Sequence, residues 1–226
     1  MKHKSIPVLW MGIAFGVAFG LAAAVLAVHG TDPKSLVAAL RLTARWAFLL
    51  FWLAYAGGAM AALFGPALES LAGRGRELGL AFAAAMLVHL GLVAWLFKIS
   101  SSPPLSEQLI VFFLIGIFWV YLLAIFSFGG LSKTLGSKGW RILRIVGMNY
   151  ILFAFAFDFV PVAIREGMHV GVWRFIQYAP FATMSVVAPF LLLAAALQRR
   201  SGMRFKFAEL RHRIVGRMHR YVSDMD

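Results

Sequence analysis

Two residues inside long apolar stretches have side chains that could do chemistry, His89 and Asp158. His89 lies in the uncharged run 78–97 and is the one of six histidines placed inside such a run. Imidazole in a membrane-spanning helix is costly unless a metal, a heme iron or a hydrogen-bonding side chain on a facing helix partners it. Asp158 is the one charged residue in the run 145–164, and a carboxyl at that depth also needs a partner. These two residues therefore define the candidate site.

Three roles remain open for His89. It could be the axial ligand of one heme, a polar packing residue, or, together with Asp158, a proton relay or a quinone contact. A hydrogen bond between His89 and Asp158 would satisfy both groups without iron, and such bonds contribute roughly 0.6–2 kcal/mol in membranes. The guanidinium of Arg41, Arg45 or Arg165 could also neutralise Asp158.

Membrane-spanning helices are the elements that would position His89 and Asp158. The chain is 62% hydrophobic and 14% charged, with a mean hydropathy of +0.82, which is typical of an integral membrane protein. We expect an all-α bundle of six transmembrane helices, and we interpret the first as retained rather than as a signal peptide. Six runs are long enough to cross a bilayer core of about 30 Å: 6–28, 46–68, 78–97, 109–131, 145–164 and 175–198.

The net charge of +13 indicates topology rather than a nucleic-acid partner. When alternate loops are assigned to alternate sides, 16 of the 22 Lys and Arg residues fall on one side. Basic residues accumulate in short cytoplasmic loops, so both termini are predicted to be cytoplasmic. Arg144 falls on this side, where it is best explained as a charge that snorkels to the interface; the alternative is a clamp for a heme propionate or a lipid headgroup.

The chain divides into the bundle, 1–198, and a basic tail, 199–226. Within the tail, apolar residues recur at helical spacing among arginines, which predicts an amphipathic helix on the anionic cytoplasmic surface; a contact with a partner protein is the alternative. The apolar residues are Phe207, Leu210, Ile214, Met218 and Tyr221.

The first apolar run carries Gly12, Gly16 and Gly20 at four-residue spacing. Glycines at this spacing form a flat helix face that lets another helix backbone approach closely. The face could pack inside the bundle or dock another membrane protein. The absence of cysteine excludes disulfides and thiolate metal sites, because no thiol exists to form them.

Two stretches resemble a known family. The segment RGRELGLAFAAAMLVH, 74–89, resembles the start of the third helix of ferric-reductase-like transmembrane domains, in which the final histidine ligates heme b. The segment LGSKGWRILRIV, 135–146, is similar to the family's approach to its fifth helix. The resemblance covers about residues 35–165, and within the family it is closest in outline to the heme-binding membrane subunit of bacterial methionine sulfoxide reductase systems. It implies a six-helix electron-transfer protein of the bacterial inner membrane.

The chain departs from the family at the heme ligands. The family's fifth-helix histidines would fall at Arg144 and at Phe157 or Asp158, so His89 alone remains. We therefore expect an accessory or structural subunit of a larger membrane complex, with lipid and other integral membrane subunits as partners and without a cofactor or catalytic residues. The alternative is an electron-transfer subunit with one heme b on His89, supplied by quinol or a flavoprotein.

Overall fold

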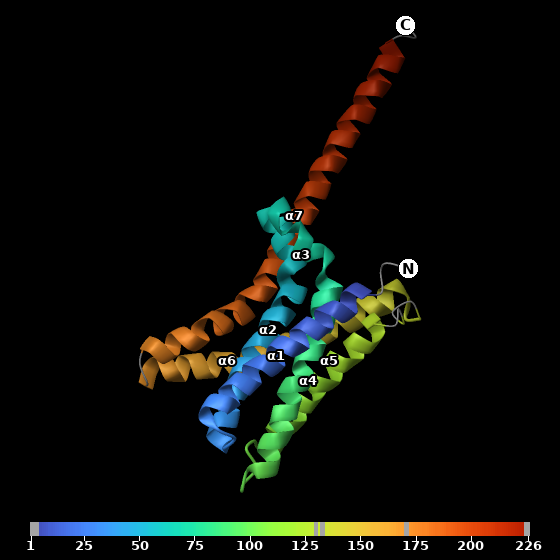
Figure 1. The fold of residues 1–226 in the computed structure, drawn as a ribbon. Helices are drawn as coiled ribbons and strands as arrows, with labels where there is room; N and C mark the ends of the chain where they lie inside the picture. Colours follow the sequence, from blue (N-terminus) through green and yellow to red (C-terminus); the bar gives the residue numbers. More distant parts are fainter. Residues whose placement is uncertain (1–4, 129–130, 132–133, 170–171, 224–226) are drawn as a thin grey trace.

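The chain folds into a bundle of long helices. The structure, a computed structural model, describes residues 5–128, 131, 134–169 and 172–223, and no strand occurs among them. Six of the helices contain segments long and apolar enough to cross a membrane, which confirms the all-helical, six-span part of the prediction. The elements are α1 (Ser5–His29), α2 (Pro33–Phe64), η1 (Pro66–Leu68), α3 (Glu69–Gly73), α4 (Gly75–Ile99), α5 (Glu107–Phe128), α6 (Gly136–His169) and α7 (Val172–Ser223) (Figure 1).

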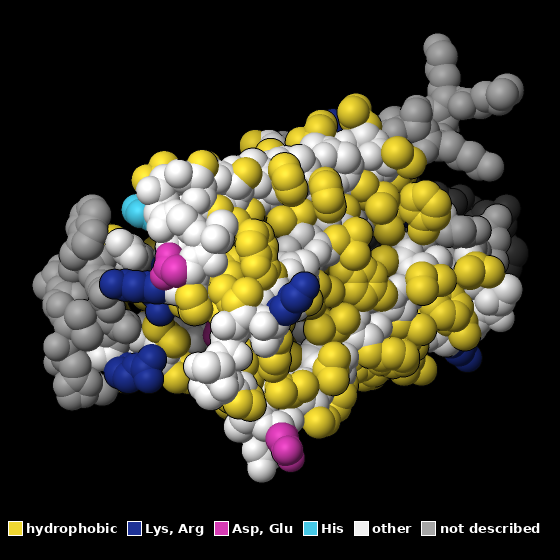
Figure 2. Space-filling model, turned by 60° about the horizontal axis from the view of Figure 1, so that its bottom comes forward, with side chains coloured by type: hydrophobic (Ala, Val, Ile, Leu, Met, Phe, Trp, Pro, Cys, Tyr) yellow, Lys and Arg dark blue, Asp and Glu magenta, His cyan; other side chains and the backbone are white. Residues whose placement is uncertain are grey.

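The bundle has two ends with different loops. One end, which we call the cavity end, carries the turns 30–32 and 100–106, the last turn of α6 and the first turn of α7 (Figure 1). The opposite end, which we call the basic end, carries the segment 65–74, the last turn of α5 and the first turn of α6 (Figure 1). Figure 2 turns the cavity end toward the viewer, and there hydrophobic side chains are widespread on the described surface and charged side chains are few.

Helix α2 begins at Pro33, well before the predicted span 46–68. Asp32 caps it, because its carboxylate accepts the backbone N–H of Lys34 at 3.0 Å and the hydroxyl of Ser35. Proline suits the first helical position, where the N–H has no helical partner. The prediction from sequence assigned residues 33–45 to a loop, because Arg41 and Arg45 lower the hydropathy of this segment. In the structure both arginines belong to the helix α2.

Aromatic packing joins the centre of the bundle. Phe48 and Phe51 of α2 are fully buried, and the Phe48 ring lies 5.1 Å from that of Phe155 and 5.2 Å from that of Phe159 on α6. Edge-on contacts of this kind stabilise aromatic pairs beyond their area burial. Helix α2 is therefore the element against which α4, α6 and α7 are positioned.

Hydrogen bonds from ring donors to backbone carbonyls tie neighbouring helices together. An indole or phenol can donate a bond while its ring stays in apolar surroundings, which suits a membrane interior. The pairs are Trp46 to Ala14 (3.1 Å), Trp52 to Met184 (2.9 Å), Tyr150 to Phe112 (2.9 Å) and Tyr121 to Ala83 (3.5 Å).

Helix α7 continues beyond its apolar segment, Phe175–Ser201, and projects from the basic end as one continuous helix (Figure 1). The expected boundary between 198 and 199 is therefore not a break in the helix. The side chains after 201 lie outside the described residues, so the amphipathic character of the tail stays a prediction.

Candidate functional site

Five polar residues singled out from the sequence line one cavity of about 460 Å³. They come from three helices: Arg41 and Arg45 from α2, His89 from α4, and Asp158 and Arg165 from α6. The helices α5 and α7 close the remaining walls. The structure thus brings His89 and Asp158 to the same cavity, although their sequence positions are far apart.

His89 has a partner that the sequence interpretation did not name. Its Nδ1 lies 3.1 Å from Oγ1 of Thr43, a fully buried residue of α2. The Thr43 hydroxyl also lies within hydrogen-bond distance of the carbonyl oxygens of Ala39 (3.0 Å) and Leu40 (3.1 Å), either of which can accept its one hydrogen. From this network we assign the imidazole proton to Nδ1, which then donates to the Thr43 oxygen and leaves Nε2 with a lone pair.

The second ring nitrogen of His89, Nε2, is the one available to the cavity. No described residue forms a hydrogen bond with Nε2, and His89 is half-buried because its ring borders the cavity. An imidazole whose Nδ1–H is fixed by a neighbour presents Nε2 as an acceptor or a metal ligand.

Thr43 was missed because it lies before the predicted span 46–68. A signal for it exists in the sequence. Apart from Ser35, which bonds to the capping residue Asp32, it is the one Ser or Thr in the helix 33–64, and it lies between Arg41 and Arg45. Once α2 is extended to Pro33, Thr43 becomes a buried hydroxyl facing α4.

Asp158 remains accessible although it lies well inside the span of α6, because it faces the cavity. No hydrogen bond to His89 and no ion pair with an arginine is formed by it within the described part of the chain. The His89–Asp158 hydrogen bond weighed above is thus replaced by the bond between His89 and Thr43.

Arg45 is held by aromatic rings. Its guanidinium carbon lies 4.8 Å from the ring centre of Tyr178 and 5.5 Å from that of Phe181, both on α7. Cations gain electrostatic stabilisation over aromatic faces, more so where water is excluded. The Nε of Arg45 is buried and has no hydrogen-bond partner among the described residues.

The family resemblance implies a heme, and a heme in this cavity would need axial ligands from the residues that line it. A low-spin heme takes two strong ligands on opposite faces. The α6 residues that line the cavity with His89 supply no strong nitrogen or sulfur ligand: they are Ile151, Ala154, Phe155, Asp158, Phe159, Val162 and Arg165. These residues do not fit a heme gripped from both faces.

Other residues that could supply a second ligand lie elsewhere. Met148 packs into the core, and the Tyr150 hydroxyl is bonded to a carbonyl of α5. His29 is exposed at the end of α1, and the His169 side chain lies outside the described residues. In the described part of the chain, no three His, Cys, Asp or Glu side chains form a metal-binding group.

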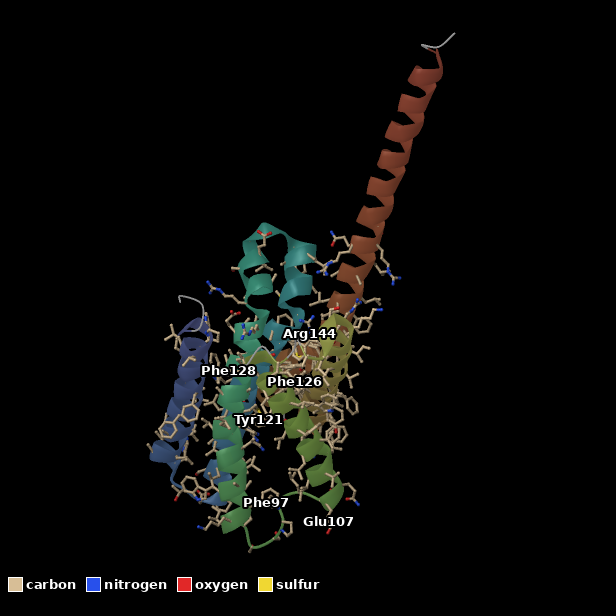
Figure 3. The ribbon with its side chains drawn as sticks, turned by 90° about the vertical axis from the view of Figure 1, so that its right-hand side faces the viewer. Phe97, Glu107, Tyr121, Phe126, Phe128 and Arg144 are labelled. Atoms are coloured by element: carbon tan, nitrogen blue, oxygen red, sulfur yellow. The ribbon has the colours of Figure 1, made fainter. Side chains whose placement is uncertain are left out.

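Arg144 is not part of this cavity. It is exposed near the start of α6 and lies toward the same end of the bundle as Phe126 and Phe128, whereas Phe97, which lines the cavity, lies toward the opposite end (Figure 3). A propionate clamp by Arg144 at the His89 cavity is therefore not supported.

The glycine row of α1 faces away from the bundle. A Cβ atom built on Gly12, Gly16 or Gly20 meets nothing within 4 Å. The face of α1 that packs inside the bundle is instead the alanine row Ala14, Ala18 and Ala22, which is buried. Of the two uses predicted for the glycines, docking of another helix is the one that this placement favours.

Comparison of the chain with protein-family models, with curated proteins and with solved structures finds no match. The ferric-reductase-like resemblance therefore stands on the two sequence segments alone.

Proposed function

We propose that the chain is an integral membrane accessory subunit of a larger complex, of the electron-transfer kind, built on a ferric-reductase-like frame whose heme site is largely lost. One observation carries the proposal: the α6 residues that line the cavity with His89 include no histidine, methionine or cysteine that could be a second axial ligand. His89 itself is engaged with Thr43, which gives it a structural role between α2 and α4.

The proposed location is the bacterial inner membrane, with both termini in the cytoplasm. The basic end of the bundle carries Arg74, Arg76, Lys138, Arg141 and Arg144, and the basic tail of α7 leaves from the same end. Basic residues favour the cytoplasmic side, so the cavity end faces outward.

The uncovered glycine row of α1 supports a role within an assembly. Small residues let helix backbones approach closely, and in a membrane that close packing drives association. Other integral membrane subunits are therefore the proposed partners, and lipid covers the remaining surface.

Isolation of the full chain from its native membrane in mild detergent tests this proposal. The chain should migrate in a species clearly larger than its own 24.9 kDa plus detergent, together with other membrane proteins and without stoichiometric heme. A monomer that carries one heme per chain would overturn the proposal.

A second candidate function keeps one heme b on His89 and moves electrons from quinol or a flavoprotein. The observation that favours it is the Nδ1–H bond to Thr43, because histidines that bind metals through Nε2 usually donate their other N–H to a nearby acceptor. The absorption spectrum of the purified chain distinguishes the two candidate functions. A heme band that is lost in His89→Ala and kept in His29→Ala would favour the electron-transfer function.

A further inference from the structure

We propose that the cavity binds an amphiphile with an anionic head, a carboxylate or a phosphate, and an alkyl tail. The juxtaposition that points to it is three arginines with one aspartate in an otherwise apolar cavity within the spanning part of the bundle. This goes beyond the proposed function, because it holds whether or not the chain sits in a complex.

The cavity charge is unbalanced. Arg41, Arg45 and Arg165 bring three positive charges, Asp158 brings one negative charge, and His89 lies with its Nδ1 proton given to Thr43. Arg41 and Arg165 are exposed, whereas Arg45 is half-buried. A charge held inside a membrane protein is costly unless paired, and among the described residues Asp158 is the one carboxylate that lines the cavity. An anionic group in the cavity would pair the excess charge.

Arg45 distinguishes this site from an arginine that reaches the membrane surface. It lies one helical turn, about 6 Å, further into α2 than Arg41. The rings of Tyr178 and Phe181 hold its guanidinium at this depth, and its buried Nε lacks a partner. An unsatisfied buried donor is a costly group that a ligand oxygen would satisfy.

The rest of the cavity suits an alkyl chain. Its walls include Val37, Leu40, Met86, Leu90 and Val93. The volume of about 460 Å³ lies within the range of roughly 300–1,000 Å³ that small-molecule sites occupy. Apolar walls with a few convergent polar groups are the usual composition of such sites.

The cavity extends to the cavity end of the bundle. Pro104 and Leu105 of the 100–106 turn and Arg165 near the end of the α6 span line it there. An amphiphile of the adjoining leaflet could enter head first along this route. Arg165 and Arg41 would meet the head before Arg45 does, because Arg45 lies deeper.

The test uses the full chain, stripped of lipid in an uncharged detergent, and measures binding by native mass spectrometry and by ligand-induced thermal stabilisation. The probes are oleate, oleyl alcohol, phosphatidylglycerol, phosphatidylcholine and inorganic phosphate. We expect oleate to bind at least about tenfold more tightly than oleyl alcohol, because charge-assisted hydrogen bonds recognise the head. Tighter binding of phosphatidylglycerol than of oleate would identify a phospholipid as the source, and the reverse order would identify a free fatty acid.

Variants assign the binding to the cavity. Arg45→Gln should weaken binding of the anionic probe at least about tenfold, and the matched control Arg144→Gln, on α6 but outside the cavity, should change it less than about twofold. Val93→Trp fills the cavity without changing its charge and should also abolish binding, which keeps the test valid if Arg45→Gln fails to fold.

Several outcomes would overturn the inference. Equal binding of oleate and oleyl alcohol would show that the arginines do not recognise the head. Equal stabilisation by inorganic phosphate alone would show a free-anion site. A heme band lost in His89→Ala would assign the cavity to heme. Since all measurements use the isolated chain, none depends on the proposed complex.

Discussion

The Nδ1 of His89 lies 3.1 Å from the Oγ1 of Thr43, which is 46 residues earlier in the chain and on another helix. The bond joins α4 to α2 inside the spanning part of the bundle. It gives the Nδ1 of the imidazole a partner that is neither iron nor Asp158. It also fixes the ring so that Nε2, rather than Nδ1, is available to the cavity.

Thr43→Val should remove the acceptor for His89 with little change in shape. We expect the free energy of unfolding to fall by about 0.6–2 kcal/mol, the range for hydrogen bonds in membrane proteins. His89→Leu should then cost less in the Thr43→Val background than in the wild type, as measured by a double-mutant cycle of reversible unfolding in mixed micelles. Ser185→Ala, which removes a hydroxyl bonded within α7, is the matched control. Costs of Thr43→Val and His89→Leu that simply add would show that the two residues do not interact.

Gly147→Ala should destabilise the packing of α5 against α6. The new Cβ would lie 2.8 Å from Cε3 of Trp119 and 2.9 Å from Cδ1 of Leu123. Both side chains would have to shift to make room, so we expect a loss of about 1–3 kcal/mol in the free energy of unfolding. Gly79→Ala on α4, whose Cβ meets nothing within 4 Å, should be neutral or slightly stabilising. Equal unfolding midpoints for the two variants would contradict the α5–α6 contact.

Gly16→Leu should separate assembly from folding. The position faces away from the bundle into open space, so the isolated chain should keep its stability within about 0.5 kcal/mol. If a partner helix covers the glycine row, the larger side chain should release the chain from the assembly seen by size-exclusion chromatography and native gels. Val17→Leu on an exposed part of the same helix is the control. An assembly that survives Gly16→Leu would exclude this face as the interface.

The start of α2 should respond to pH through Asp32. The hydroxyl of Ser35, followed by the backbone N–H groups of Lys34 and Ser35, holds the pKa of Asp32 below its usual value, which is about 3.9. Because the folded pKa is depressed, the stabilisation is full above about pH 4 and is lost as the pH falls through the lower folded value. Hydrogen exchange of the first turn of α2 should therefore accelerate in that window. Asp32→Asn retains a capping oxygen and should show no such step; a step of equal size in the variant would refute the assignment.

Much of the fold could be predicted from the sequence, because six apolar runs of sufficient length specify six spans. The start of α2 was missed, because Arg41 and Arg45 made a buried helical segment look like a loop. Because the predicted span began at residue 46, Thr43 was left outside it and was not identified as the partner of His89. The convergence of His89, Asp158 and three arginines on one cavity depends on how α2, α4 and α6 pack. No sequence spacing encodes that packing.

The reduced-minus-oxidised absorption spectrum of the full chain, purified after expression with a heme precursor supplied, is the most direct measurement. With His89 bonded to Thr43 and no second ligand across the cavity, we expect no sharp α-band and far less than one heme per chain. A sharp α-band from one heme per chain, held from both faces and abolished by His89→Ala, would contradict the interpretation of the cavity.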